Sequence, residues 1–291
     1  MHKRGAHAVP KRNRLRVGFQ GELGAFSQQA IRQLFGSKAL PVAHQRFDEV
    51  FAALDAGAVN VAVVPLENTL VGSIHENFDL LLKYPFEITA ETSVRVIHNL
   101  MAPPGATFRS IHTVYSHPVA LGQCLDFFAK HPRLQRTPFY DTAGSVKMVM
   151  EQKPEGAAAI ASELAAQTYG ANILKRGIED DRQNFTRFFL LEPAGAKPRA
   201  VPGASGHPWK TSLVLTTKNI PGALFRALSA LALRDINLIK IESRPLRGKP
   251  WEYLFYLDLI GHRDEKNVRN ALAHLAELAD FLRVLGSYRA A

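Results

Sequence analysis

A segment rich in proline and glycine divides the chain into two parts. Residues 193–208 contain four prolines, three glycines and almost no large apolar side chain, which is typical of a linker. A chain of 291 residues is too long for one typical hydrophobic core. We therefore predict a basic flexible tail over 1–14, a first part over 15–192, a linker over 193–208 and a second part over 209–291.

The first part alternates short apolar runs with amphipathic stretches, which predicts strands and helices in turn. Such alternation is typical of α/β layers with largely parallel sheets. Roughly 175 residues are many for one small sheet, so we predict two lobes with a ligand cleft, roughly 15–95 with 176–192 and 96–175. The predicted strands are 15–19, 61–64, 88–96, 112–115 and 157–160, and the predicted helices are 26–35, 48–56, 74–82, 118–128, 143–150 and 162–169.

The second part has the element order βαββαβ, which predicts a ferredoxin-like fold. Pro221 and Gly222 open its first helix, which runs to about Arg234, and residues 247–250 form its central hairpin. One face of the predicted sheet is expected to need a partner. The predicted strands are 211–217, a strand that ends at 243, 251–260 and 281–287, and the second helix is 265–279.

The composition is typical of a soluble globular protein, with 46% apolar and 21% charged residues. No apolar run reaches the length that spans a membrane. Cys124 is the only cysteine, which excludes an intramolecular disulfide and a cysteine-rich metal site and favours a reducing cytoplasm. We expect Cys124 to be a buried small apolar residue rather than a nucleophile.

The net charge of +10 can indicate nucleic-acid binding. Six of the basic residues lie near the N-terminus, however, and the others are scattered, so a substrate with carboxylates or plain solubility explains the charge as well. We predict no nucleic-acid and no membrane partner. The N-terminal stretch lacks the apolar run of a secretory signal, and a flexible tail is favoured over an organelle transit peptide. The six residues are Lys3, Arg4, Lys11, Arg12, Arg14 and Arg16.

A threonine between two aromatic residues lies near the end of the first part. In an extended segment, alternation places Asn184, Thr186 and Phe188 on one face and Phe185 and Arg187 on the other. A lone threonine in a strand is usually structural. A functional role for Thr186 is favoured more strongly because other polar segments upstream also lie where predicted strands end.

The first of these segments places Gly18, Gly21 and Gly24 between a predicted strand and a predicted helix. The spacing lacks the G-x-G of a dinucleotide loop, so nucleotide binding is not predicted. The glycines either let backbone N–H groups at the helix start face a small anion, such as a carboxylate, or form a tight turn.

Glu67, Asn68 and Thr69 follow a buried predicted strand, where they would face the cleft. A turn with helix capping is the alternative, and these residues alone slightly favour it. Farther along, Thr142, Ala143 and Gly144 begin another predicted helix. They would either hold a carboxylate or only start that helix.

Ser116 and His117 precede a proline at the start of a predicted helix, and Gln123 projects one to two turns later. Ser116 is suited to cap the helix, and His117 is a candidate general base. No Ser-His-Asp spacing or glycine-flanked nucleophile is present, which disfavours hydrolase chemistry. The histidines show no metal-ligand pattern, so no metal is predicted.

Taken together, these segments and the second part resemble the prephenate dehydratase family over roughly residues 16–288. The resemblance implies a two-lobed, periplasmic-binding-protein-like α/β catalytic domain with a cleft, followed by a ferredoxin-like βαββαβ ACT domain. It implies a hydro-lyase that converts prephenate to phenylpyruvate in L-phenylalanine biosynthesis and needs no cofactor. It also implies a homodimer or homotetramer that is regulated by phenylalanine through the ACT domain.

The resemblance implies functional roles for particular residues of this sequence. The catalytic residues implied are Thr186, Glu67, Asn68, Ser116 and Gln123. The substrate-binding residues implied are Gly21, Thr69, His117, Thr142, Ala143, Gly144, Asn184 and Phe188. Arg187 is expected to support the strand or to pin a carboxylate, and the structural role is favoured. The effector-binding residues implied are Gly222, Ala223, Leu224, Asn237, Glu242, Ser243 and Arg244.

Two positions depart from the family pattern. Val119 stands where the family often has glutamine, and Ala25 stands where it often has threonine, so each removes a polar contact. A chorismate mutase segment is not expected before Arg16. Arogenate dehydratase, which acts on the aminated substrate, is the alternative within the class, and a non-enzymatic ligand sensor is an alternative outside it.

Overall fold

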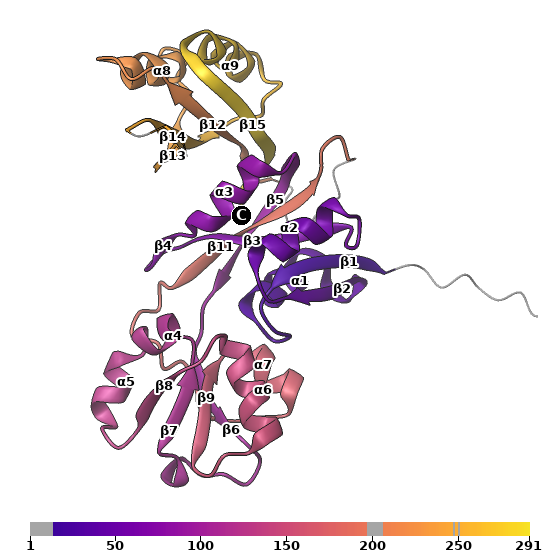
Figure 1. The fold of residues 1–291 in the computed structure, drawn as a ribbon, viewed down its shortest axis with the longest axis vertical. Helices are drawn as coiled ribbons and strands as arrows, with labels where there is room; N and C mark the ends of the chain where they lie inside the picture. Colours follow the sequence, from indigo (N-terminus) through magenta and orange to yellow (C-terminus); the bar gives the residue numbers. More distant parts are fainter. Residues whose placement is uncertain (1–13, 197–205, 247, 250) are drawn as a thin grey trace, which may run out of the picture.

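The computed structural model describes residues 14–196, 206–246, 248–249 and 251–291. Most of the predicted tail and linker, and Arg247 and Pro250 of the predicted hairpin, lie outside these residues. Three bodies are stacked along the long axis in Figure 1. The first lobe lies in the middle, the second lobe lies at one end, and the C-terminal domain (206–291) lies at the other.

The first lobe contains a mixed sheet in the order β2-β1-β3-β11-β5, with β4 paired to β3. β1 is parallel to β2 and β3, whereas β11 is antiparallel to β3 and β5. The prediction of largely parallel sheets is wrong, because β11, which returns from the second lobe, runs antiparallel to β3 and β5, and β6 of the second lobe runs antiparallel to β9 and β10. The strands are β1 (Leu15–Gln20), β2 (Ala39–His44), β3 (Val61–Asn68), β4 (Gly72–Ser73), β5 (Phe86–Arg95) and β11 (Phe185–Pro193).

The second lobe contains a sheet in the order β10-β6-β9-β7-β8, in which β7 is parallel to β8 and β9. Residues 96–98 and 176–184 connect the two lobes and bond to each other, since the Ile178 N–H donates to the His98 carbonyl at 2.9 Å. The predicted two-lobed α/β architecture is confirmed. The strands are β6 (Asn99–Ala102), β7 (Thr113–Ser116), β8 (Gln135–Pro138), β9 (Ala157–Ala161) and β10 (Asn172–Lys175).

The C-terminal domain has an antiparallel sheet in the order β13-β14-β12-β15, with α8 and α9 packed on one face. This is the predicted ferredoxin-like arrangement. The opposite face packs on the first lobe, so the expected need for a partner is met within the same chain. The strands are β12 (Trp209–Thr217), β13 (Leu238–Pro245), β14 (Tyr253–Ile260) and β15 (Ala279–Arg289).

The helix predicted over 118–128 is two helices. The chain breaks at Gln123 and Cys124, and the carboxylate of Asp180 accepts the N–H groups of Leu125 and Asp126 at 2.8 and 3.0 Å. A cap from a distant segment starts the second helix, which local periodicity cannot reveal. The helices are α1 (Phe26–Phe35), α2 (Phe47–Asp55), α3 (His75–Lys83), α4 (Pro118–Gly122), α5 (Leu125–Lys130), α6 (Thr142–Gln152), α7 (Glu163–Tyr169), α8 (Ala223–Ala232) and α9 (Lys266–Leu278).

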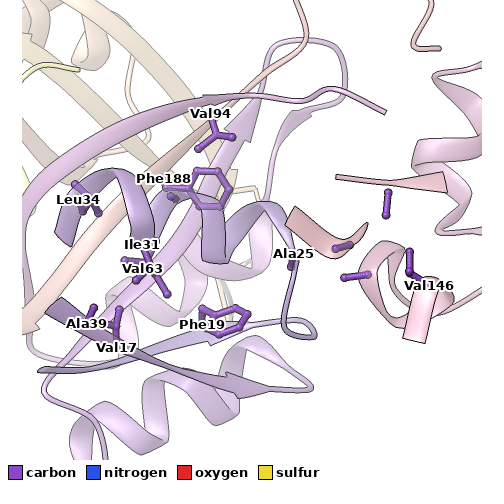
Figure 2. Close-up of a cluster of buried hydrophobic side chains, with 14 of the residues drawn as sticks. Val17, Phe19, Ala25, Ile31, Leu34, Ala39, Val63, Val94, Val146 and Phe188 are labelled. Carbon is purple, nitrogen blue, oxygen red and sulfur yellow. The ribbon is translucent and has the colours of Figure 1, made fainter. Parts of the chain in front are cut away.

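One hydrophobic core joins the two lobes. Figure 2 shows Ala25 between the first-lobe residues around Phe19 and Val146 of the second lobe. Close packing explains Gly24, because a Cβ there would lie 2.6 Å from the Cα of Ala165. In addition, the hydroxyl of Ser162 donates to the Gly24 carbonyl at 2.6 Å. The loop before α1 therefore fixes one side of the interlobe contact.

A second core is shared by the first lobe and the C-terminal domain. Phe189 and Phe78 of the first lobe pack in one cluster with Tyr256, Leu285 and Tyr288 of the C-terminal domain. The guanidinium of Arg283 also donates to the carbonyls of four residues near the end of α3 and the start of β5. Burial of apolar surface is the main favourable term in such packing, so the two bodies stabilise each other.

Gly286→Ala tests this docking. The new Cβ would lie 2.0 Å from the Ile88 carbonyl oxygen on β5, so the free energy of unfolding should fall by about 1–3 kcal/mol through overpacking. Urea unfolding measures the change. Gly122→Ala is the control, because a Cβ there meets no atom of the described structure within 4 Å. Equal stability of both variants and the parent would contradict the close approach.

Candidate active site

A cleft of about 390 Å³ lies between the two lobes. The structure places six of the sequence-predicted site residues in its wall, and they come from both lobes. Val119 and Ala25, the two family departures, also line it. The six residues are Asn68, His117, Gln123, Thr142, Thr186 and Phe188.

Thr186 and Asn68 form the polar centre of the first-lobe wall. They are cross-strand partners on β11 and β3, and the Asn68 Nδ2 group donates to Thr186 Oγ1 at 3.0 Å. Asn68 Oδ1 accepts the backbone N–H groups of Leu70 and Val71 at 3.0 and 3.1 Å. These two bonds fix which side of the amide is oxygen, so the amide nitrogen must face Thr186.

This arrangement determines what Thr186 can do. A hydroxyl has one proton and two lone pairs, and Asn68 occupies a lone pair of Thr186 Oγ1. The proton of Thr186 is therefore left for a ligand in the cleft. Phe188, two residues along the same strand face, supplies an apolar wall and is 1% exposed.

A buried histidine orients Gln123. Gln123 Oε1 lies 2.8 Å from His98 Nε2, and His98 is 2% exposed. Burial lowers the pKa of His98, so its neutral form predominates at pH 7. Since Oε1 only accepts, His98 Nε2 carries the proton, and the Gln123 amide nitrogen is left to donate to a ligand.

His117 and Asp141 lie at the start of two helices of the second lobe. His117 Nδ1 accepts the Val119 N–H at 3.2 Å, which leaves the Nε2 proton as the donor, and burial lowers the pKa of His117. Asp141 Oδ1 accepts the Gly144 N–H at 2.7 Å as the cap of α6. Burial, more than its neighbour Glu22, raises the pKa of Asp141.

Helix starts give the cleft its electrostatic character. Ala25, Ile74, His117 and Asp141 are the N-cap residues of α1, α3, α4 and α6, and all four line the cleft. Helix N-termini carry free N–H groups and partial positive charge, which favour anions. Among the described residues, no lysine or arginine lines the cleft, and Asp141 is its one carboxylate. Ligand carboxylates would therefore be held by backbone dipoles and neutral donors.

Three predicted site residues have other roles. Glu67 faces away from the cleft, because alternation along β3 sends it to the side opposite Asn68; it pairs with Arg187 Nε at 2.8 Å. The Ser116 hydroxyl is fully buried and donates to the Ile160 carbonyl at 2.6 Å. Thr69 bonds the backbone of Gln183 and Phe185, which joins the β3 turn to β11. None of these three lines the cleft, and His117 rather than Ser116 is the N-cap of α4; the roles implied for Glu67, Ser116 and Thr69 stay predictions.

Other predicted residues lie behind the wall. Gly21 has a φ of 113° and donates its N–H to His44, so it shapes the turn before α1. Ala143 and Gly144 are buried in the first turn of α6. Asn184 is buried and accepts from Asn68 Nδ2 at 2.7 Å, so it supports that amide. Arg187 lies on the face opposite Thr186, as alternation predicts.

His98 and Asp141 were not among the predicted contacts. Asp141 shows a sequence signal, since an aspartate before a Thr-Ala-Gly turn is a standard N-cap, but capping does not reveal exposure to a cleft. His98 shows no sequence signal, because it lies in a connecting segment without the periodic hydrophobic pattern of a helix or strand. Cys124 is buried, and burial raises the pKa of its thiol, as expected for an unreactive cysteine.

The predicted effector residues fall in two places within one chain. Gly222, Ala223 and Leu224 line a hollow of about 240 Å³ at the start of α8, together with Trp251. Asn237 instead accepts the Ile260 N–H through its carbonyl. In β13, Glu242 and Arg244 point to the first lobe, where Glu242 accepts from Ser73 at 3.0 Å and Arg244 lies 3.5 Å from Asp79, while Ser243 is exposed.

No group of three or more histidine, cysteine, aspartate or glutamate side chains among the described residues is arranged to hold a metal ion. None of the described helices has both the length and the apolar composition needed to cross a bilayer.

Comparison with protein families decides the assignment. The prephenate dehydratase model matches residues 17–196, and the ACT domain model matches residues 211–277. The chain belongs to the prephenate dehydratase family. It is therefore an enzyme of the hydro-lyase class with a C-terminal ACT domain, as the motifs predicted.

Several relatives extend over nearly the whole chain. Arogenate dehydratase/prephenate dehydratase 2 of Arabidopsis thaliana, named as chloroplastic, is 42% identical over 97% of this chain and 74% of the relative. Prephenate dehydratase of Arthrobacter aurescens, solved in complex with L-Phe, is 31% identical, with a TM-score of 0.85 over 94% of this chain and 90% of that one. A structure titled as a novel type of quorum quenching acylase is 32% identical, with a TM-score of 0.86 over 95% and 98%.

Asp141→Asn tests the burial of this carboxylate. A folded-state pKa above the ordinary value of 3.8 means that the stabilisation is present at low pH and is lost as the pH rises through the folded pKa. Asparagine caps helices about as well as aspartate, so the stability of the variant relative to the parent should increase as the pH rises from about 4 through the folded pKa of Asp141. Urea unfolding at several pH values measures the difference. A difference independent of pH would contradict the assignment.

Proposed function

We propose that this enzyme removes water and carbon dioxide from prephenate and releases phenylpyruvate. The observation that supports this most is the Thr186 hydroxyl, which faces the cleft with its proton available while Asn68 holds its oxygen. In this reaction the ring C–O bond breaks, and the ring carboxylate leaves as carbon dioxide. Its electron pair enters the ring, which becomes aromatic, and the departing hydroxide takes a proton to become water.

The main barrier is departure of hydroxide from the ring. A donor on the leaving oxygen stabilises the charge that develops there. The pKa of a threonine hydroxyl is too high for a free acid, so Thr186 acts by position and electrostatics and relays a proton without losing it permanently. His117 Nε2 and the Gln123 amide are further donors in the same cleft.

The substrate carboxylates match the remaining walls. The pyruvyl carboxylate suits the start of α1 at Ala25, where backbone dipoles favour an anion, rather than the start of α6, which the Asp141 carboxylate already caps. The ring carboxylate suits the apolar wall formed by Phe188 and Val96, which are 1% and 5% exposed. A poorly solvated carboxylate loses carbon dioxide more readily, since the transition state carries less localised charge.

Thr186→Val is the direct test of the donor. Valine keeps the shape but has no hydroxyl, so kcat should fall about 10²–10⁴-fold with prephenate while KM changes little. Thr186→Ser should recover most of the lost rate. Thr92→Val is the matched control, because Thr92 lies opposite Phe188 on β5 and bonds only Gln33 among the described contacts. Near-parental turnover by Thr186→Val would remove Thr186 from the mechanism.

Arogenate is a second candidate substrate, and the charge of the cleft supports it. Arogenate carries an ammonium group where prephenate has a ketone. Asp141 supplies a buried carboxylate in a wall without described cations, and charge-assisted bonds of this kind are strong. One of the relatives carries both substrates in its name.

Side-by-side turnover of the two substrates decides between them. If Asp141 binds the ammonium group, Asp141→Asn should lower kcat/KM for arogenate relative to prephenate by about 10- to 100-fold. An unchanged ratio would show that Asp141 does not discriminate. The same preparation is assayed for acylase activity, because one similar structure bears that title.

We also infer feedback by phenylalanine and assembly into a homodimer or homotetramer. The ACT domain, the relative solved with L-Phe and the hollow at Gly222–Leu224 support a phenylalanine site. Phe225, Leu233 and Trp251 are more than three-quarters exposed on that domain, which supports a further contact surface. The single cysteine remains the support for a cytoplasmic location.

A further inference from the structure

A buried group of charges lies directly behind the Thr186–Asn68 pair. Arg187 and Glu67 are the next cross-strand partners along β11 and β3. Because side chains alternate along a strand, they point to the opposite face, toward the ACT domain. The two strands therefore carry the proposed donor pair on one face and an interdomain ion network on the other.

A bulge in β3 adjusts this geometry. Arg187 pairs with Glu67, and the next residue, Phe188, pairs with Pro65. Leu66 therefore has no partner on β11 and is the extra residue of the bulge. Leu66 packs in the core shared with the ACT domain, and Pro65 lines the cleft. Leu66 and Glu67 thus share the face toward the ACT domain. Bulges commonly re-aim side chains beside active sites.

Arg187 connects three carboxylates. Its Nε lies 2.8 Å from Glu67, and its Nη1 lies 2.8 Å from Asp258 of the ACT domain and 3.3 Å from Glu91. Two ACT lysines complete the group. Lys210 pairs with Glu91 at 2.8 Å, and Lys240 forms an ion pair with Glu67. Lys240 also lies 3.8 Å from Glu242 of its own strand, so the described group has three cations and four carboxylates.

Burial makes four of these charges depend on their partners, whereas the side chains of Lys240 and Glu67 are 15% and 31% exposed. The side chains of Glu91, Asp258 and Lys210 are 3%, 6% and 6% exposed, and that of Arg187 is 14% exposed. Burial alone would lower the pKa of Arg187, but the nearby carboxylates outweigh it and raise that pKa, so the guanidinium stays charged. Removing one partner leaves an uncompensated buried charge.

The network reaches the proposed effector segment through β13. Lys240 lies two residues before Glu242, and both side chains contact Ser73, at 3.3 and 3.0 Å. Ser73 lines the cleft and is the β4 partner of Glu67. A displacement of β13 would therefore change the contacts of Glu67, which is adjacent to Asn68 in the sequence.

We propose that Arg187, Glu67 and Lys240 are positioning residues that couple the ACT strand β13 to the Thr186–Asn68 pair. This inference rests on the proposed dehydratase function and on Thr186 as its donor. A ligand that moves Lys240 away from Glu67 alters the alignment of β3 and β11.

The test compares Lys240→Gln with two control variants. Lys240→Arg keeps the charge and should behave as the parent. Lys249→Gln removes a lysine whose partner, Glu252, lies in the same domain at 3.4 Å, with the lysine 62% exposed. Lys240→Gln should lower kcat roughly 2- to 30-fold with KM nearly unchanged, and it should weaken the response of kcat to phenylalanine.

A double-mutant cycle separates coupling from independent roles. If Glu67 acts through Lys240, Glu67→Gln with Lys240→Gln should be no slower than the slower single variant. Losses that multiply would overturn the proposal, because they would mean that Glu67 acts separately. Parental kcat and parental phenylalanine response in Lys240→Gln would also overturn it.

Hydrogen exchange measures the structural coupling without any substrate, so it separates failure of the coupling proposal from failure of the proposed function. The amides of residues 184–190 should exchange faster in Lys240→Gln than in Lys249→Gln, whatever the substrate. If the parent protein converts neither prephenate nor arogenate but this exchange still changes, the proposed function fails and the structural coupling stands. If the parent is active and the exchange is unaltered, the coupling fails and the function stands.

Discussion

The pairing of β3 with β11 is the constraint on which the site depends. It brings Asn68 beside Thr186 although they are far apart in the sequence, and two backbone N–H groups fix the Asn68 amide so that it donates to the threonine. The same register sets Arg187 against Glu67 on the reverse face. A strand cannot shift on one face alone, since a slip of one residue exchanges its two faces. The chemistry of the cleft and the docking of the ACT domain are therefore linked by backbone geometry.

Charge is distributed in a way that suits decarboxylation. The described cations nearest to Thr186 along the strands face the ACT domain, while four helix starts and neutral donors line the cleft. Partial charges of helix ends are fixed in place and need no counterion. In the proposed reaction the ring carboxylate would face the apolar wall of Phe188 and Val96, and no described lysine or arginine lines the cleft to form an ion pair that would resist loss of carbon dioxide. Asp141 is the exception, and its chemistry suits an amino group.

Local pattern predicted most of the helices and one face of the key strand, but it did not predict the strands β2, β4, β6, β8 and β10. Alternation alone separated Thr186 from Arg187, and the same rule applied to β3 would have separated Asn68 from Glu67. Contacts between segments that are far apart in the sequence could not be predicted from local pattern. The Asp180 cap that divides α4 from α5, the insertion of β11 between β3 and β5, and the placement of His98 all depend on the tertiary fold. Ser116 was misassigned because a buried hydroxyl bonded to a backbone carbonyl has the same sequence signature as a cap.

A structure of the enzyme with a ring-reduced analogue of prephenate, which keeps the hydroxyl but cannot become aromatic, tests the central claim most directly. The account predicts that the ring hydroxyl lies within hydrogen-bond distance of Thr186 Oγ1, about 2.7–2.8 Å, while the Asn68 amide still donates to that oxygen. A complex in which the ring hydroxyl faces another wall, with Thr186 bound only to Asn68, would contradict it.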